Sequence, residues 1–237
     1  MKIIQSIMTK NPCYTAGKKI AVKGLMLHSI GVGQPKASVL INSWNKASFK
    51  SACVHAFIDG NTGDIYQTLP WNHRGWHGGG SSNNTHIGVE MCEPAQIKYT
   101  GGANFIVTDV NTAKTVVTRT YEAAVELFAH LCKEYNLNPL GDGVIVGHAE
   151  GHKRGIASNH ADPEHLWKGL RLPYTMGGFR KDVKAAMSKA SAPVAPTKTN
   201  VIYRVQVGAY GKKSNAVNMQ KRLKADGYDA IIVEVEK

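Results

Sequence analysis

The sequence contains no apolar run of about 18 residues, the length that a helix needs to cross a bilayer. Its first residues, Met1 to Ser6, carry one lysine and too short an apolar segment for a secretory signal. We therefore expect a protein that is made in the cytoplasm without a signal peptide and that does not insert into a membrane.

Cysteine is scarce, and its four copies are dispersed as Cys13, Cys53, Cys92 and Cys132. No Cys-x-x-Cys pair occurs, which argues against a cysteine-based zinc knuckle. Synthesis in the cytoplasm argues against disulfides. We therefore expect these cysteines to behave as small buried apolar residues.

Acidic residues are outnumbered by basic ones, 17 to 29, which gives a formal net charge of +12. Such a balance favours a polyanionic partner. The basic residues form no run of five or six, and they lack the clustering with aromatic residues that is typical of nucleic-acid readout. We expect an acidic cell wall, and not nucleic acid, as the partner.

Small residues and two prolines without apolar periodicity fill residues 188–200, which predicts a linker. It separates a body, residues 1–187, from a tail, residues 201–237. Apolar runs in the body predict strands near 22–29, 52–58, 64–69, 86–91 and 143–148. Turn residues between the second and third of these runs predict a hairpin.

An apolar stripe at helical spacing predicts a helix over residues 119–135. Phe179, Val183 and Met187 recur every four residues and predict a closing helix. Strands and helices in this order favour an α/β fold, a central mixed β-sheet flanked by helices.

The tail has the pattern of a single βαβ unit. Alternation over residues 203–210 and the apolar run 228–235 predict two strands, and residues 214–225 predict a helix between them. A unit this small buries little surface, so we expect it either to be part of a larger domain or to be completed by a second chain in an oligomer.

Two apolar runs of the body each end on a histidine, His28 and His148, and Asp162 stands directly before a proline. Two strand-end histidines and one carboxylate form a three-ligand set that leaves a fourth tetrahedral position open, as in a catalytic zinc site. His152 and His160 are competing ligands; His152 follows His148 at a helical ligand spacing, but nearby glycines argue against a long helix.

Glu90 ends an alternating run in which Ile87 and Val89 share one face while Gly88 and Glu90 share the other. An acid on an apolar strand is costly to bury unless it is paired or functional, and beside a metal it can act as a general base. The alternative is an exposed glutamate on an edge strand.

Residues 71–82 combine tryptophan, histidine and arginine with a run of glycines. Such a loop can wrap a saccharide or a peptide by stacking and hydrogen bonding. A flexible surface loop with a few packed tryptophans is the plainer alternative.

Together these residues resemble the zinc-dependent N-acetylmuramoyl-L-alanine amidases of the type-2 family, and in particular amidase endolysins of clostridial phages and prophages. The resemblance covers about residues 20–170, and its pieces occur in the family's order. The matching pieces are Leu27-His28-Ser29, Val54-His55 to Asp59, Ile65-Tyr66-Gln67, Trp76-His77-Gly78, Ile87 to Glu90, Gly147-His148 and Asp162-Pro163.

The resemblance implies zinc ligands at His28, His148 and Asp162, with His152 in reserve because the gap between the second and third ligands is long. It implies a catalytic acid–base role for Glu90. His160 stands where relatives carry a lysine or threonine that stabilises the oxyanion, so it is expected in the same role.

The same resemblance implies substrate-binding positions at His55, Trp76 and His77. The tail resembles a SPOR domain, a family that binds peptidoglycan, through the segments around Tyr203–Tyr210 and Gly227–Ala230. Only one of the two βαβ halves of such a domain is expected in residues 201–237.

The implied activity is hydrolysis of the amide bond between N-acetylmuramic acid and L-alanine of the stem peptide. The implied context is a phage or prophage endolysin, made in the bacterial cytoplasm and acting on the cell wall after holin-dependent release. One alternative is a non-catalytic peptidoglycan-binding protein on the same fold. Another is a metal-independent glycosidase, which would need two carboxylates about 5–9 Å apart and would leave the histidines unexplained.

Overall fold

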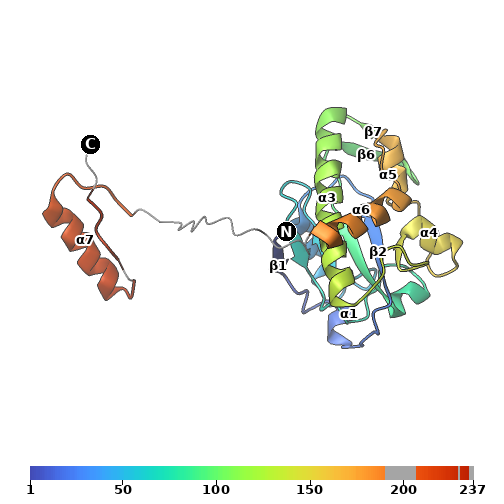
Figure 1. Cartoon of the computed structure of the whole chain (residues 1–237), viewed down its shortest axis with the longest axis horizontal. Helices are drawn as coiled ribbons and strands as arrows, with labels where there is room; N and C mark the ends of the chain where they lie inside the picture. Colours follow the sequence, from blue (N-terminus) through green and yellow to red (C-terminus); the bar gives the residue numbers. More distant parts are fainter. Residues whose placement is uncertain (190–206, 229, 235–237) are drawn as a thin grey trace. The chain divides into compact units, whose positions relative to one another are not determined.

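The computed structural model describes residues 1–189, 207–228 and 230–234 (Figure 1). The chain divides into two compact units, Met1–Pro193 and Val194–Lys237. Most of the predicted linker, residues 190–200, lies outside the described residues, so the proposed domain boundaries stay a prediction.

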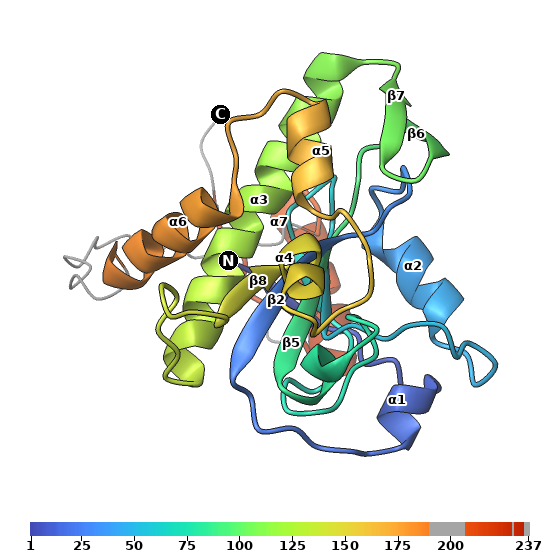
Figure 2. The same cartoon turned by 90° about the vertical axis from the view of Figure 1, so that its right-hand side faces the viewer.

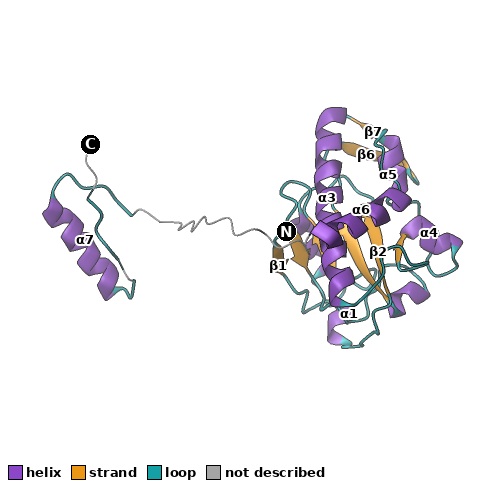
Figure 3. Cartoon of the chain, viewed as in Figure 1, coloured by secondary structure: helices purple, strands orange, loops and turns teal. Residues whose placement is uncertain are grey.

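A six-stranded mixed sheet forms the centre of the N-terminal unit, surrounded by helices (Figure 3). In spatial order its strands are β1 (Ile3–Gln5), β4 (Ile65–Gln67), β3 (Ala56–Ile58), β5 (His86–Met91), β2 (Gly24–Ser29) and β8 (Ile145–Gly147). Strands β3 and β4 pair antiparallel, which confirms the predicted hairpin, and the other neighbours are parallel. The predicted α/β class is confirmed.

The strands bury different side chains on their two faces. On one face, Leu25 and Leu27 of β2 join Ile87 and Val89 of β5 in the main core, which the long helix α3 (Val110–Glu134) covers. On the other face, Phe57 of β3 packs in a second cluster with residues of α2 (Ala37–Trp44). Because side chains alternate along a strand, His28 and Glu90 belong to the face away from α3.

Helix α3 begins nine residues earlier than expected from residue 119, since Asp109 caps it: the Asp109 side chain accepts a hydrogen bond from the Thr112 backbone N–H at 3.0 Å. The first turns already bury Ala113 and Val117, which extend the apolar stripe. The predicted closing helix is confirmed as α6 (Met176–Lys189), which packs on α3 and buries Phe179 (Figure 1).

Several short elements were not expected from the sequence. They are α1 (Pro12–Thr15), the 3₁₀ turn η1 (Ser81–Asn84), α4 (His148–Lys153), α5 (Glu164–Gly169) and the two-stranded hairpin of β6 (Ile97–Gly101) and β7 (Asn104–Val107), besides α2 and β1. Figure 2 shows β2, β5 and β8 side by side, with α4 beside β2. None of the described helices is long and apolar enough to span a membrane.

In the C-terminal unit, the predicted helix is present as α7 (Lys213–Ala225). The two predicted strands are not found where the structure describes them: residues 207–210 and 230–234 carry no strand. Helix α7 buries none of its side chains. Within the described residues, α7 is therefore the only part of the expected βαβ unit that is found; residues 203–206, 229 and 235 of the two predicted strands lie outside the described residues.

Candidate metal centre

The sheet brings His28 and Glu90 together. Strands β2 and β5 run parallel, and His28 lies in register with Glu90. Both side chains are buried, at 1% and 9% exposure. Strand β5 lies inside the sheet, between β3 and β2, so Glu90 is not the exposed edge-strand residue that the sequence left open.

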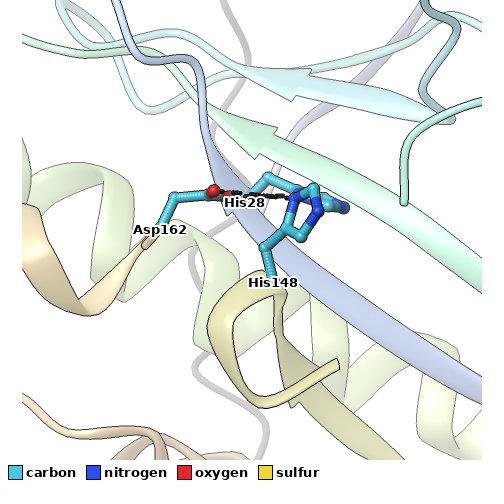
Figure 4. Close-up of side chains that lie close together, drawn as sticks. All are labelled: His28, His148 and Asp162. Carbon is cyan, nitrogen blue, oxygen red and sulfur yellow. Dashed lines mark hydrogen bonds and ion pairs between the residues drawn. The ribbon is translucent and has the colours of Figure 1, made fainter. Parts of the chain in front are cut away.

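His148 is the first residue of α4, directly after β8, and Asp162 lies just before α5. Figure 4 shows the side chains of His28, His148 and Asp162 converging. The Nδ1 atoms of the two histidines are 3.1 Å apart, and Asp162 Oδ2 lies 3.2 Å from His28 Nδ1. One ligand atom from each residue lies within 4.8 Å of the others, and all three residues are buried.

The electrostatics of this group favour a positive charge between the three side chains. Burial alone would lower the pKa of His28, but the hydrogen bond to Asp162 and the nearby Glu90 charge raise it above the ordinary value. Burial and the neighbouring His28 lower the pKa of His148 to about 4. Burial opposes ionisation of Asp162, yet its hydrogen bond with His28 keeps its pKa below normal. A bound cation would take the place of the proton that His28 otherwise holds.

A hydrogen-bond relay fixes which nitrogen of His28 faces Asp162. His77 Nε2 donates to the carbonyl oxygen of His86 at 3.0 Å, so Nδ1 of a neutral His77 is an acceptor. His28 Nε2 lies 3.1 Å from that acceptor and donates to it. Burial holds the pKa of His77 well below its ordinary value, which keeps it neutral. The lone pair of a neutral His28 therefore lies on Nδ1, toward His148 and Asp162.

The outer nitrogen of His148 is also occupied. His148 Nε2 lies 3.2 Å from Ser158 Oγ and 3.2 Å from Nδ1 of His160. His160 is itself exposed. His152, the reserve ligand, is exposed on α4 and its Nδ1 lies 3.4 Å from the Ala157 carbonyl oxygen, outside the converging group.

Glu90 keeps one oxygen without a partner. Its Oε2 is buried and makes no hydrogen bond, and burial raises its pKa to about 8. A carboxyl group with a raised pKa and a free oxygen beside a polar site is suited to move a proton near neutral pH.

The expected substrate contacts of His55 and His77 need correction. His55 is fully buried; its Nε2 donates to the His73 carbonyl oxygen at 2.8 Å and its Nδ1 accepts from the Gly88 backbone N–H at 3.0 Å. His77 is buried in the relay already described. Neither ring has a free nitrogen for a substrate. Trp76, in contrast, is 42% exposed.

A buried carboxylate that the sequence analysis missed lies next to the site. Glu93 accepts hydrogen bonds from the Gly31 backbone N–H and from the Tyr99 hydroxyl, each at 2.9 Å. The Tyr99 oxygen also lies 2.8 Å from His165 Nε2. Burial raises the pKa of Glu93 to about 7. Glu93 comes shortly after the apolar β5 segment. An acidic residue in an apolar segment is the pattern that indicated Glu90, and the same pattern could have indicated Glu93.

The donor set fits zinc. Two imidazole nitrogens and one carboxylate oxygen are ligands that zinc accepts, a three-residue set leaves a position open, and hydrogen bonds to the outer nitrogens of both histidines orient the rings. The structure thus brings together the three residues that the sequence indicated, and no other three-residue group of potential ligands is found among the described residues.

Comparison with known proteins agrees with this architecture. The family model of N-acetylmuramoyl-L-alanine amidases matches residues 18–165, more than half of the chain, and a SPOR-domain model matches residues 178–235. The SPOR match begins inside α6, well before the predicted tail. The chain matches no curated protein.

Solved structures share the fold. The hydrolase AmiA of Staphylococcus aureus, solved with its ligand, has a TM-score of 0.60 and 20% identity, covering 83% of this chain and 88% of that one. The catalytic domain of XlyA has a TM-score of 0.53 and 20% identity, covering 77% and 99%. PlyL has a TM-score of 0.53 and 17% identity, covering 77% and 97%.

Fold and site therefore define a hydrolase with an α/β body and a histidine–aspartate centre. The chain belongs to the N-acetylmuramoyl-L-alanine amidase family, which cleaves the amide bond between N-acetylmuramic acid and the stem peptide. Members of this family are typically zinc-dependent, and the buried group could hold such a metal.

Proposed function

We propose that this amidase uses zinc held by His28 Nδ1, His148 Nδ1 and one Asp162 oxygen to hydrolyse the bond between the lactyl group of N-acetylmuramic acid and L-alanine. The observation that carries the proposal is that one ligand atom from each of these three buried residues lies within 4.8 Å of the others, with the two Nδ1 atoms 3.1 Å apart. Zinc, when bound, supplies Lewis-acid chemistry that polarises the amide carbonyl and acidifies water.

Glu90 is the proton carrier in this proposal. Its unpartnered Oε2 takes a proton from the attacking water and returns it to the amine that leaves. The C–N bond breaks as the carbonyl carbon gains oxygen. The products are the carboxylate of the lactyl group and a free amino terminus on L-alanine.

His160 is the oxyanion donor in this proposal. It is exposed and lies beside His148 through the 3.2 Å contact of their ring nitrogens. An N–H of His160 would stabilise the negative charge that develops on the carbonyl oxygen, a contribution of about 3 kcal/mol for donors of this type.

The wider context is also part of the proposal. Peptidoglycan is the partner, engaged by the amidase body and by the SPOR-like segment. Two linked contacts with one polymer raise the overall affinity through effective concentration, and the +12 charge favours an acidic wall. We assign the protein to the endolysins, with holin-dependent release from the cytoplasm; PlyL and XlyA share its fold.

The two alternatives are less favoured. A non-catalytic binding protein would have no need of a complete ligand set beside an unpartnered buried carboxylate. For a glycosidase, Glu90 and Asp162 would form the carboxylate pair, but the hydrogen bond from His28 occupies Asp162.

Digestion of purified Gram-positive walls tests the proposal. We expect release of new N-terminal L-alanine without new reducing ends, loss of the activity in EDTA and its return with zinc. New reducing ends, or full activity in EDTA, would contradict it.

A further inference from the structure

A cavity of about 200 Å³ lies outside the metal centre. It is lined by three cationic residues, Lys18, Lys50 and Arg74, and by two aromatic residues, Phe49 and Trp76. No carboxylate occurs among the described residues that line it. Like charges repel one another, so an anion that joins these side chains would be attracted by all three.

Hydrogen bonds to backbone atoms and a stacked pair of rings hold the cavity in shape. The Asn11 side chain donates to the carbonyl oxygens of Trp44 and Ala52, at 3.0 and 3.2 Å. The Arg74 backbone N–H donates to Lys18 O at 2.8 Å, which joins two of the segments that carry cations. The Trp44 and Phe49 rings stack with centroids 5.2 Å apart. The walls therefore exist before a ligand arrives, which lowers the entropy cost of binding.

The aromatic wall distinguishes this cavity from a simple patch of surface charge. The Arg74 guanidinium lies over the Trp76 ring, 5.2 Å from the ring centroid. Trp76 nevertheless remains 42% exposed. An exposed indole offers a surface for a sugar or an apolar chain. The cations next to it select an oxyanion attached to such a skeleton, by charge-assisted hydrogen bonds.

The cavity is also linked to the metal centre. Trp76 directly precedes His77, whose Nδ1 accepts the hydrogen bond from His28. Cys53 and Trp76 exchange backbone hydrogen bonds of 2.9 Å, which fix the Trp76 backbone. The cavity and the centre are therefore connected through the consecutive residues Trp76 and His77.

We propose that the cavity between Lys18, Lys50, Arg74 and Trp76 is a subsite for an oxyanion of the wall polymer, either a stem-peptide carboxylate or a teichoic-acid phosphodiester. This subsite rests on the proposed function, because it takes the substrate to be peptidoglycan. It places a specificity contact outside the residues that carry out the hydrolysis.

The first test is the K18Q/K50Q double variant, which removes two exposed charges. The matched control is K23Q/K133Q, two exposed lysines in front of β2 and at the end of α3. On whole walls we expect about a fivefold rise in KM for the first variant, the size expected for two exposed charge contacts. Its kcat should stay unchanged, and the control should remain within twofold of wild type in both parameters. A KM equal to that of the control, or a fall in kcat alone, would overturn the subsite.

The same KM measurement on walls stripped of teichoic acid identifies the source of the oxyanion. A KM difference that vanishes on stripped walls assigns the subsite to the phosphodiester. A difference that persists assigns it to the stem-peptide carboxylate.

A second readout does not depend on amidase activity. Cys13 lines the cavity, and its hydrogen bond with Cys53 lowers its pKa, which favours alkylation. In EDTA-treated protein, we expect glycerol 3-phosphate or a muramoyl peptide with free carboxylates to slow alkylation of Cys13 by iodoacetamide in wild type but not in K18Q/K50Q. Protection by neither probe would overturn the subsite. If walls release no amino termini while Cys13 is protected, the proposed function fails and the anion site stands.

Discussion

Two groups of buried histidines lie next to each other and differ in what their ring nitrogens contact. In His28 and His148, the Nδ1 atoms face each other and Asp162, and only the outer nitrogens have protein partners away from the centre. In His55 and His77, both nitrogens are already engaged. The difference separates side chains that can bind a metal from those whose ring nitrogens are fully used in protein hydrogen bonds, although all four are buried.

The largest effect should come from His148→Ala, which removes one ligand. We expect zinc content to fall from one per chain to near zero and wall hydrolysis to fall on the order of a thousandfold. The matched control is His152→Ala, which changes the exposed histidine four residues later and should keep both properties. If zinc were lost from the control but not from His148→Ala, His152 and not His148 would be the zinc ligand.

Glu90→Gln should lower kcat by about a hundredfold or more, since it removes the proposed proton carrier. It should also stabilise the metal-free protein at alkaline pH. The pKa of Glu90 is raised from 4.5 to about 8, so the folded state keeps a proton that the unfolded chain loses. The stabilising effect of that proton is complete below pH 4.5 and is lost as the pH rises to about 8.

Urea unfolding of EDTA-treated protein at pH 5 and pH 8 measures this effect. Glutamine cannot ionise, so at pH 8 the variant should be more stable than wild type. We expect a difference on the order of 3 kcal/mol, because a shift of one pKa unit corresponds to about 1.4 kcal/mol and relaxation of the folded protein reduces the full amount. At pH 5 the difference should be small. Equal stability at both pH values would argue against a buried, protonated Glu90.

Substitution of His77 tests the relay. His77→Phe removes the acceptor for His28 Nε2 and should weaken zinc binding about 10–100-fold, as for other partners of metal-bound histidines. His77→Asn keeps an acceptor near the Nδ1 position and should recover part of the affinity. Competition with a zinc chelator gives both affinities; equal losses in the two variants would mean that His77 acts through packing alone.

The smallest effect on the metal should come from His55→Asn. It keeps an acceptor for the Gly88 N–H and removes the donor to the His73 carbonyl oxygen. We expect a stability loss of about 1–3 kcal/mol in urea unfolding, with zinc affinity within twofold of wild type. A large loss of zinc affinity in a folded His55→Asn protein would erase the distinction between the two histidine groups.

The sequence was sufficient to predict the class of the fold and the group of His28, His148 and Asp162, because a histidine at the end of an apolar strand is visible as a local pattern. Glu90 was found in the same way, from alternation. The supporting roles of His55 and His77 could not be predicted, because they depend on carbonyl oxygens of residues that only the folded chain brings near.

Other differences have equally physical causes. Tyr99 lies in the short β6–β7 hairpin, whose few residues give too little periodicity to predict its contact with Glu93. The early turns of α3 depend on the Asp109 cap. In the described part of the C-terminal unit, local alternation predicted strand over residues 207–210 and 230–234, where none is found, and α7 buries no side chain that would hold a strand there.

The central claim is that His28 and His148 present Nδ1, and not Nε2, to a zinc ion shared with Asp162. A crystal structure of the zinc-loaded protein, with anomalous scattering at the zinc edge, tests this most directly. We predict one zinc peak with both Nδ1 atoms and one Asp162 oxygen at about 2.0–2.2 Å, and His77 still accepting from His28 Nε2. Ligation through Nε2 of either histidine, or His152 in place of a proposed ligand, would contradict the account.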